Sequence, residues 1–309
     1  MNDAGNISRR TALGGLIAAM ASSAPLKAAD TARLTRQSRR VITYMPNGAG
    51  VPVAVELLLR GKGPLVVLLP SLGRGARDFD DLASRIAAAG YRTAAVNPRG
   101  IGQSRGPEPH SLADYASDVF EAIRVLQSQH GRGPAMPVVL IGHAYGNRLA
   151  RAVAARYPEA VSSLILLASG GQVTMAPTVA RALTDVFDTT LSPEAHIAAV
   201  RIAFFAPGND PEVWRDGWYG AVAMQQIRAV RNSPADTWVA GGDRPIFIIQ
   251  AAQDVVAPPA NAEALRAAHP DRVAVAVLEN AGHAMLPEQP DKLAQLVLGR
   301  LAAGRKAIG

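Results

Sequence analysis

Five residues in the middle of the chain, Gly142 to Gly146, have the spacing of a nucleophile elbow, the sharp turn that presents a reactive side chain at the mouth of a sheet. They follow the apolar run 138–141 and precede a helical pattern. Gly142 and Gly146 lie two before and two after the centre, where small residues let strand and helix approach closely. The central residue is Ala144, whose methyl group cannot attack a carbonyl. The sequence therefore predicts the turn without its nucleophile.

Two residues further along the chain have side chains suited to acid–base chemistry. Asp254 comes just after the predicted strand 246–250, and His283 follows the next strand, 273–278. Asp243 is a weaker candidate, because it precedes its strand and is expected at the opposite edge of the sheet. Asp254 and His283 are therefore the candidate catalytic acid and base.

The elements that position these residues follow the pattern of a mainly parallel α/β sheet. Short β-branched runs alternate with amphipathic stretches after residue 40, as expected for strands covered on both faces by helices. We predict eight strands, the first two as an antiparallel hairpin, at 41–44, 51–59, 65–69, 93–96, 138–141, 164–167, 246–250 and 273–278. Helices are predicted at 76–89, 112–130, 147–156 and 290–301. Residues 41–171 and 243–309 then form a single core.

Residues 172–242 interrupt this alternation. They contain several helical pieces separated by prolines, and they are rich in aromatic side chains. Because they lie between the predicted sixth and seventh strands, we expect them over the carboxyl ends of the sheet, where active sites form. We interpret them as a helical lid over an apolar pocket; the alternative is a subdomain whose aromatics fill a small core of their own. The candidate pocket residues are Ser71, His143, Phe204, Phe205, Trp214 and Trp218.

Over residues 41–302 the chain resembles the α/β-hydrolase superfamily, with the elbow, the acid and the histidine in the family's order. The resemblance implies a catalytic triad in which Asp254 and His283 remain and Ala144 occupies the nucleophile position. It also implies an oxyanion hole formed by the backbone amides of Leu72 and Tyr145. Backbone donors do not depend on side-chain identity, so this hole does not require a serine at position 144.

The empty elbow leaves three functions open. One is a serine hydrolase whose nucleophile has been replaced, so that Ala144→Ser would restore attack on esters. Another is an enzyme without a covalent intermediate, in which His283 acts as a general base, as in lyase or cofactor-free oxygenase members of the fold. The third is a non-catalytic protein that binds a small ligand. We expect a hydrolase-like protein acting on a small apolar ester or related carbonyl substrate.

The positive charge of the chain is concentrated at its N-terminus. Residues 1–40 hold seven Lys and Arg against two Asp and Glu, and so contribute +5 of the net charge of +7. The remaining chain carries only +2 and has no basic run or RNA-type aromatic motif, so we expect no nucleic-acid partner. Arg9 and Arg10 precede an apolar stretch that resembles a twin-arginine export signal over residues 1–29, followed by a linker over 30–40. This pattern predicts a periplasmic or secreted protein; the alternative is a cytoplasmic enzyme with a basic tail.

Composition also limits the partners that we expect. The chain has no cysteine, which excludes disulfides and thiolate chemistry. The sequence shows no metal-spaced cluster and no phosphate-binding loop, so we expect neither a metal nor an organic cofactor. The N-terminal apolar run is too short for a stable membrane span, which needs about 20 apolar residues. The expected partner is a small-molecule substrate or ligand.

Overall fold

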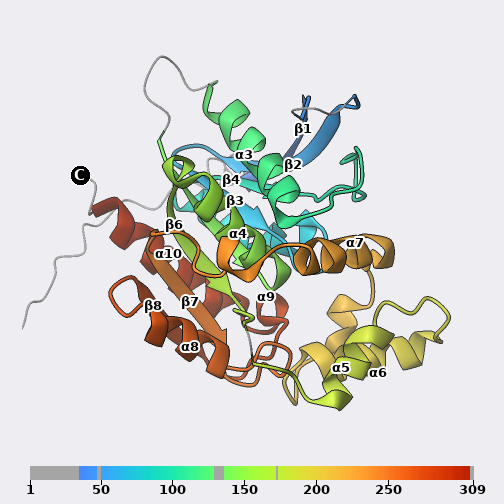
Figure 1. Ribbon diagram of the computed structural model, residues 1–309. Helices are drawn as coiled ribbons and strands as arrows, with labels where there is room; N and C mark the ends of the chain where they lie inside the picture. Colours follow the sequence, from blue (N-terminus) through green and yellow to red (C-terminus); the bar gives the residue numbers. More distant parts are fainter. Residues whose placement is uncertain (1–34, 47–49, 129–135, 172, 307–309) are drawn as a thin grey trace, which may run out of the picture.

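Eight strands form one sheet in the computed structural model, which describes residues 35–46, 50–128, 136–171 and 173–306 (Figure 1). The spatial order is β1-β2-β4-β3-β5-β6-β7-β8. Strands β1 and β2 pair antiparallel, as do β2 and β4, and every other neighbouring pair is parallel. The strands are β1 Ser38–Tyr44, β2 Val53–Gly61, β3 Leu65–Leu69, β4 Arg92–Val96, β5 Val138–His143, β6 Val161–Leu167, β7 Ile246–Ala251 and β8 Val273–Leu278.

The predicted fold class, an eight-stranded and mostly parallel α/β sheet, is confirmed. Strands β3 and β8 have the predicted bounds, whereas β1 begins within the segment predicted as a linker. It does so because Ser38 to Arg40 continue the ladder opposite Leu59 to Leu57. Such backbone pairing needs no apolar side chain, so hydrophobicity did not reveal it. The predicted export signal lies outside the described residues.

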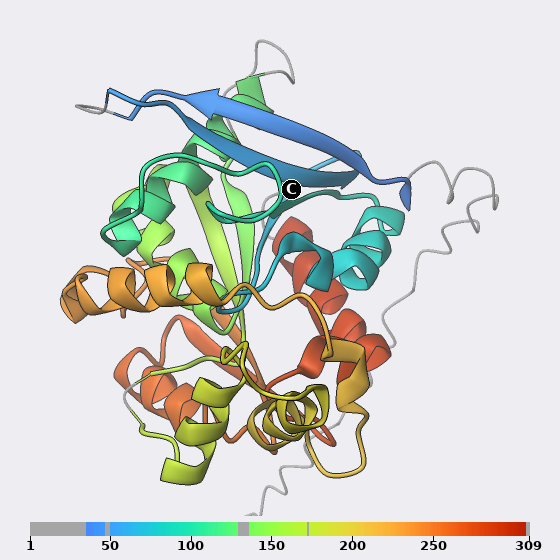
Figure 2. The same ribbon diagram turned by 90° about the vertical axis from the view of Figure 1, so that its right-hand side faces the viewer.

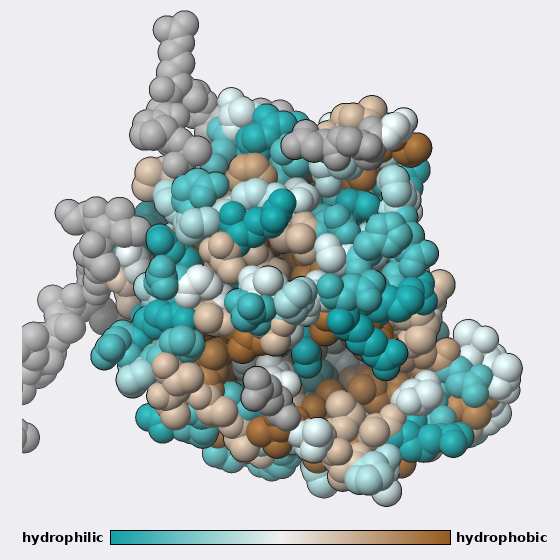
Figure 3. Space-filling view, in the orientation of Figure 1, coloured by the Kyte–Doolittle hydropathy of each residue, from teal (hydrophilic) through white to brown (hydrophobic). Residues whose placement is uncertain are grey.

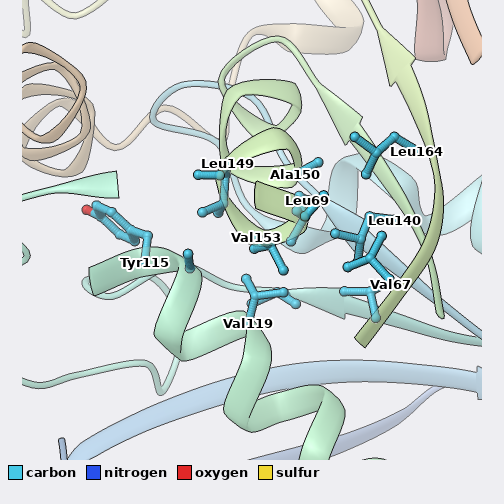
Figure 4. Packing of buried hydrophobic residues seen from close by; sticks show 14 of the residues in the cluster. Val67, Leu69, Tyr115, Val119, Leu140, Leu149, Ala150, Val153 and Leu164 are labelled. Carbon is cyan, nitrogen blue, oxygen red and sulfur yellow. The ribbon is translucent and has the colours of Figure 1, made fainter. Parts of the chain in front are cut away.

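Helices cover both faces of the sheet (Figure 2). Along β3, Val66 and Leu68 belong to one apolar core, with α2 (Asp80–Ala88) and α10 (Pro290–Lys306). Val67 and Leu69 belong to the other core, with α3 (Leu112–Ser128), α4 (Tyr145–Arg156) and α8 (Ala260–Ala268). Figure 4 shows part of this second core. A strand buried on both faces reads as a continuous apolar run, because alternate side chains enter opposite cores.

The segment between β6 and β7 is helical. It contains α5 (Pro177–Asp185), α6 (Pro193–Phe204), η3 (Pro211–Trp214), α7 (Gly220–Arg231) and η4 (Ala235–Thr237). Three of these helices begin at a proline, which is favourable in the first turn, where its missing N–H has no partner to lose. The α5–α6 pair packs together, and α7 lies apart from it (Figures 1 and 2).

Three short elements complete the fold: η1 (Ala76–Phe79), η2 (Pro158–Ala160) and α9 (Met285–Glu288). Within the described ranges, none of the helices combines the length and the apolar character needed to cross a membrane.

Strand β5 and helix α4 meet at two glycines. A Cβ atom added at Gly142 would overlap the carbonyl of Gly146, and one added at Gly146 would overlap the carbonyl oxygen of Leu69. The strand, the following helix and the neighbouring strand β3 therefore approach as closely as their backbones allow. This contact explains physically why the elbow needs small residues at both positions.

Gly146→Ala should destabilise the fold by about 1–3 kcal/mol, because the new methyl group must displace backbone atoms. Gly299→Ala is the matched control. Gly299 lies in α10 with nothing within 4 Å of an added Cβ, so alanine there should be neutral or stabilising by up to about 1 kcal/mol. Urea unfolding of both variants measures the difference, and equal stability would contradict the packing argument.

Candidate active site

The elbow keeps the backbone of a nucleophile turn. Ala144 has φ 50° and ψ −107°, a sparsely populated conformation for a residue with a side chain, which typically costs on the order of 1–3 kcal/mol. Its N–H donates to the carbonyl of Leu167 (3.0 Å), and its own carbonyl accepts from the N–H of Asn147 (3.1 Å). The methyl group is partly exposed. The strained turn therefore persists around a side chain with no reactive atom.

Two backbone amides at the carboxyl edge of the sheet, where the elbow lies, are free donors. The N–H groups of Leu72, after β3, and Tyr145, the first residue of α4, have no acceptor among the described residues. Strands β3 and β5 are neighbours with Leu69 opposite Gly142, so the two amides lie at the same edge of the sheet. The start of α4 adds the positive end of its helix dipole. This is the arrangement that an oxyanion hole requires.

Side chains from elsewhere hold the loop that follows β3. The Gly73 N–H donates to Oε1 of Gln226 in α7 (2.8 Å), and the Ala76 N–H donates to Oδ1 of Asn97 (2.7 Å). Ser71 is buried, and its carbonyl accepts from the Arg74 N–H (3.2 Å). Neighbouring amides of the loop are thus occupied, while that of Leu72 is left for a ligand.

Asp254 and His283, 29 residues apart in the chain, form a buried pair. The Nδ1 atom of His283 lies 3.0 and 2.9 Å from the two carboxylate oxygens of Asp254. Oδ1 of Asp254 also accepts from the N–H groups of Val256 (3.0 Å) and Ala257 (2.7 Å), which fix the carboxylate. A carboxylate at Nδ1 selects the tautomer with its proton on that nitrogen, so Nε2 is the free basic atom. The two side chains, which the sequence places on separate loops, therefore meet, and Asp254 orients the His283 ring so that it can act as a base.

His143 lies next to this pair, with its ring centroid 5.3 Å from that of His283, and is fully buried. Its Nε2–H donates to the backbone carbonyl of His283 (2.8 Å). Burial, followed by the neighbouring His283 and Arg74, lowers the pKa of His143 to about 3. The side chain expected in the pocket wall is instead a neutral support for the His283 backbone.

The aromatic cluster, which we define as Phe204, Phe205, Trp214 and Trp218, packs against both histidines. The Phe204 ring lies 5.6 Å from that of His283, and the Trp214 ring lies 6.1 Å from that of His143. The cluster belongs to a small apolar core formed mainly by the helical segment. This agrees with the alternative interpretation of that segment, a subdomain whose aromatic side chains fill their own core. The cluster nevertheless contacts His283, the candidate base, and His143. This face of the molecule is hollowed between α7 and the α5–α6 pair (Figure 3).

Arg74 is an important residue that the sequence did not single out. Its guanidinium lies 4.4 Å from the ring centroids of both Trp214 and Trp218. It also forms a two-bond ion pair with Asp78 (2.6 and 2.8 Å) and donates to the carbonyl of Asp216 (3.0 Å). The sequence showed only that Arg74 and Asp78 are four residues apart. Ion pairs with this spacing usually lie on the surface of a helix. Arg74 joins the loop after β3 to the aromatic cluster.

Glu288 makes a second connection of this kind. Its carboxylate accepts from the N–H of Gly282, beside His283, and from the N–H of Ala206 and the side chain of Asn209, each at 2.7 Å. Burial raises the pKa of Glu288. No sequence pattern indicated this role, because Ala206 and Asn209 come from a distant segment. Across the residues described, no group of three or more His, Cys, Asp or Glu side chains is placed to hold a metal ion.

Comparison with protein families matches residues 62–290 to the family described as serine aminopeptidase, S33. The chain is 32% identical over 116 residues to 2-(acetamidomethylene)succinate hydrolase of Mesorhizobium japonicum, covering 37% of this chain and 39% of the relative. It is 28% identical over 151 residues to monoacylglycerol lipase of Mycolicibacterium smegmatis, covering 48% and 52%. The match thus spans less than two thirds of the length of either relative.

A longer match covers 78% of this chain and 91% of the putative carbamate hydrolase RutD of Cronobacter turicensis, at 24% identity over 256 residues. Among solved structures, a membrane phospholipase A described as a bacterial virulence factor superposes with a TM-score of 0.69 at 19% identity, covering 90% of this chain and 89% of the other. An esterase from Exiguobacterium antarcticum gives 0.67 at 21% identity, covering 81% and 96%. At such identities these structures show a shared fold.

Arg74→Leu should lower the free energy of unfolding by about 3 kcal/mol, because it leaves the Asp78 carboxylate without its partner in a largely buried site. Arg77→Leu removes an exposed arginine with a 3.8 Å ion pair and should change stability by less than about 0.5 kcal/mol. Chemical denaturation of the two variants tests the contrast. Similar effects for both would show that Arg74 does not anchor the loop.

Acid should destabilise the protein through His143. The unfolded state binds a proton below a pKa of about 6.5, whereas the folded state resists it down to about 3. Stability from this residue is therefore present above about pH 6.5 and falls by about 1.4 kcal/mol per pH unit below it. His143→Gln should show a shallower loss of stability between pH 6 and pH 4 in urea unfolding. Parallel pH curves for the two proteins would contradict the assignment.

Proposed function

Because the chain belongs to the serine aminopeptidase S33 family of α/β-hydrolases, we propose that it hydrolyses a small ester or related carbonyl substrate without a covalent intermediate. Its curated relatives include a monoacylglycerol lipase and other hydrolases. The observation that carries the proposal is the buried Asp254–His283 pair, which keeps an oriented base although the nucleophile is absent.

In the proposed reaction, Nε2 of His283 takes a proton from a water molecule as that water attacks the carbonyl carbon. The carbonyl oxygen becomes an oxyanion, which the amides of Leu72 and Tyr145 stabilise. Collapse of the tetrahedral intermediate breaks the bond to the leaving group, which receives the proton back from His283. Asp254 stabilises the transient imidazolium and keeps the ring oriented.

Ala144 is compatible with this reaction. An alanine side chain lacks the hydroxyl oxygen of serine, so it leaves room beside His283 for the attacking water. Enzymes stripped of their triad retain about 10³–10⁴-fold acceleration over water from the oxyanion hole and binding. Such a rate suits an intrinsically labile substrate, such as an activated ester or the carbamate in the name of one relative.

The aromatic cluster supports an apolar group on the substrate. Phe204 lies beside His283, and Trp218 stacks on Phe204 at 5.2 Å. We assign the helical segment between β6 and β7 the role of a lid over this site. The twin-arginine signal over residues 1–29, with export of the protein, is part of the same proposal.

The alternatives use the same residues differently. A lyase or cofactor-free oxygenase would employ His283 to remove a proton from its substrate. A protein that only binds a ligand needs no base. The three hydrogen-bond donors that fix Asp254, one of them His283 itself, favour a catalytic role over binding alone.

His283→Ala should reduce the hydrolysis of p-nitrophenyl acetate by about 10²–10⁴-fold, because no other group accepts the proton of the attacking water. The release of p-nitrophenolate measures the rate. His110→Ala, which removes an exposed histidine, is the control and should retain the wild-type rate. Hydrolysis by the wild type that survives His283→Ala unchanged would refute general-base catalysis by this residue.

Ala144→Ser provides the matched comparison for the missing nucleophile. The variant should react covalently with a fluorophosphonate probe, whereas the wild type should turn over substrate without being labelled. Mass spectrometry of the intact protein distinguishes the two. If the wild type shows no turnover and Ala144→Ser alone creates it, the protein is a disabled hydrolase instead.

A further inference from the structure

Helix α4 carries two arginines just after the elbow, Arg148 and Arg151, and neither forms an ion pair with any described residue. Arg151 is almost fully buried, and its donors are occupied by the carbonyls of Gly170 (2.8 Å) and Val239 (3.2 Å) and the side chain of Asn147 (2.9 Å). Arg148 differs, because its guanidinium has no hydrogen-bond acceptor in the described chain. Of the two arginines, only Arg148 has its donors free.

The surroundings of Arg148 place it beside the elbow. It follows Ala144 by four residues and therefore lies about one helical turn beyond the elbow. A methyl group at Gly170 would lie 3.3 Å from Nη2 of Arg148. Gly170 belongs to the loop after β6, the strand whose Leu167 carbonyl binds the elbow amide.

An aromatic ring forms the other side of this position. The guanidinium lies 5.4 Å from the ring centroid of Trp238, in the segment between α7 and β7 that passes beside α4 (Figure 1). Trp238 is 5% exposed, and its indole N–H also has no acceptor among the described residues. The unsatisfied groups that Arg148 and Trp238 bring here are hydrogen-bond donors, so this position is suited to an acceptor.

The positive charge of Arg148 favours an acceptor that is negatively charged. Arg148 is half-buried, and burial lowers its pKa, while no carboxylate of the described residues forms an ion pair with it. A cation in such a position is unfavourable unless an anion pairs with it. A guanidinium binds a carboxylate through two parallel N–H···O bonds. One free guanidinium matches the single charge of a carboxylate better than the double charge of a phosphate.

We propose that Arg148 binds a carboxylate group of the substrate, so that the protein acts on carbonyl compounds that also carry a carboxylate. This inference rests on the proposed hydrolytic function and specifies its substrate class. The carboxylate lies beside the start of α4, and the scissile carbonyl lies between His283 and the amides of Leu72 and Tyr145.

Succinate binding tests the anion site independently of turnover, with uncharged succinamide as the matched probe. Succinate should raise the melting temperature of the full-length protein more than succinamide does. Arg148→Gln should weaken succinate binding at least about tenfold in calorimetry, and Arg148→Lys should retain part of it. Arg156→Gln, at an exposed position in the last turn of the same helix, should bind like the wild type.

Kinetics supply the second readout. Arg148→Gln should raise the KM for mono-4-nitrophenyl succinate about tenfold and leave that for p-nitrophenyl acetate unchanged. Circular dichroism verifies that Arg148→Gln is folded, and Arg148→Lys provides a second variant that retains the charge. Equal binding of succinate and succinamide, or succinate binding unchanged by Arg148→Gln, would overturn the assignment.

The two proposals fail in different ways. Succinate binding should persist in His283→Ala, because that variant removes the base and not the anion site. Ester hydrolysis that depends on His283, together with succinate binding independent of Arg148, would overturn only the carboxylate site. Succinate binding that depends on Arg148, in a protein without turnover, would overturn the hydrolytic function and keep the anion site.

Discussion

The close contact of β5, α4 and β3 at the elbow is the constraint on which the site depends. Gly146 packs against the backbone at the end of β3, so no side chain fits between them. The contact holds Ala144 in its strained conformation and aims the start of α4 at the loop that carries Leu72. A strained residue persists only where its surroundings determine it. Here the surroundings are backbone atoms, which are the same whether the central residue is serine or alanine.

This independence explains which parts of the candidate site do not require a serine. The proposed oxyanion hole consists of backbone amides, and the proposed base, His283, is held by a carboxylate from a different loop. Neither depends on a hydroxyl at Ala144. In the proposed mechanism, alanine at position 144 therefore removes the covalent step and leaves a buried histidine base together with two free donors. A low local dielectric strengthens the interactions of the base and of the two donors with any charge that develops between them.

Three polar side chains, of which Arg74 and Gln226 are buried and Glu288 is half-buried, connect the helical segment 173–242 to the loops of the site. The Arg74 guanidinium lies over two tryptophan rings of that segment, Gln226 accepts from the loop after β3, and Glu288 joins the His283 loop to the end of α6. Each connection satisfies a donor or a charge that would be costly to bury alone. Movement of the helical segment would thus be coupled to the oxyanion loop and to the base.

The sheet, the elbow and the order of Asp254 and His283 could be predicted from the amino-acid sequence. Strands buried on both faces have continuous apolar sequences, and close backbone contacts require glycine. Both features can therefore be recognised in short stretches of the sequence. The contacts of His143, Arg74, Glu288 and the pair Arg148 and Arg151 became apparent from the three-dimensional structure. Whether a buried polar side chain is satisfied or free depends on atoms from distant segments. No local pattern encodes those neighbours, because hydrogen bonds and desolvation depend on distance in space and not on spacing along the chain.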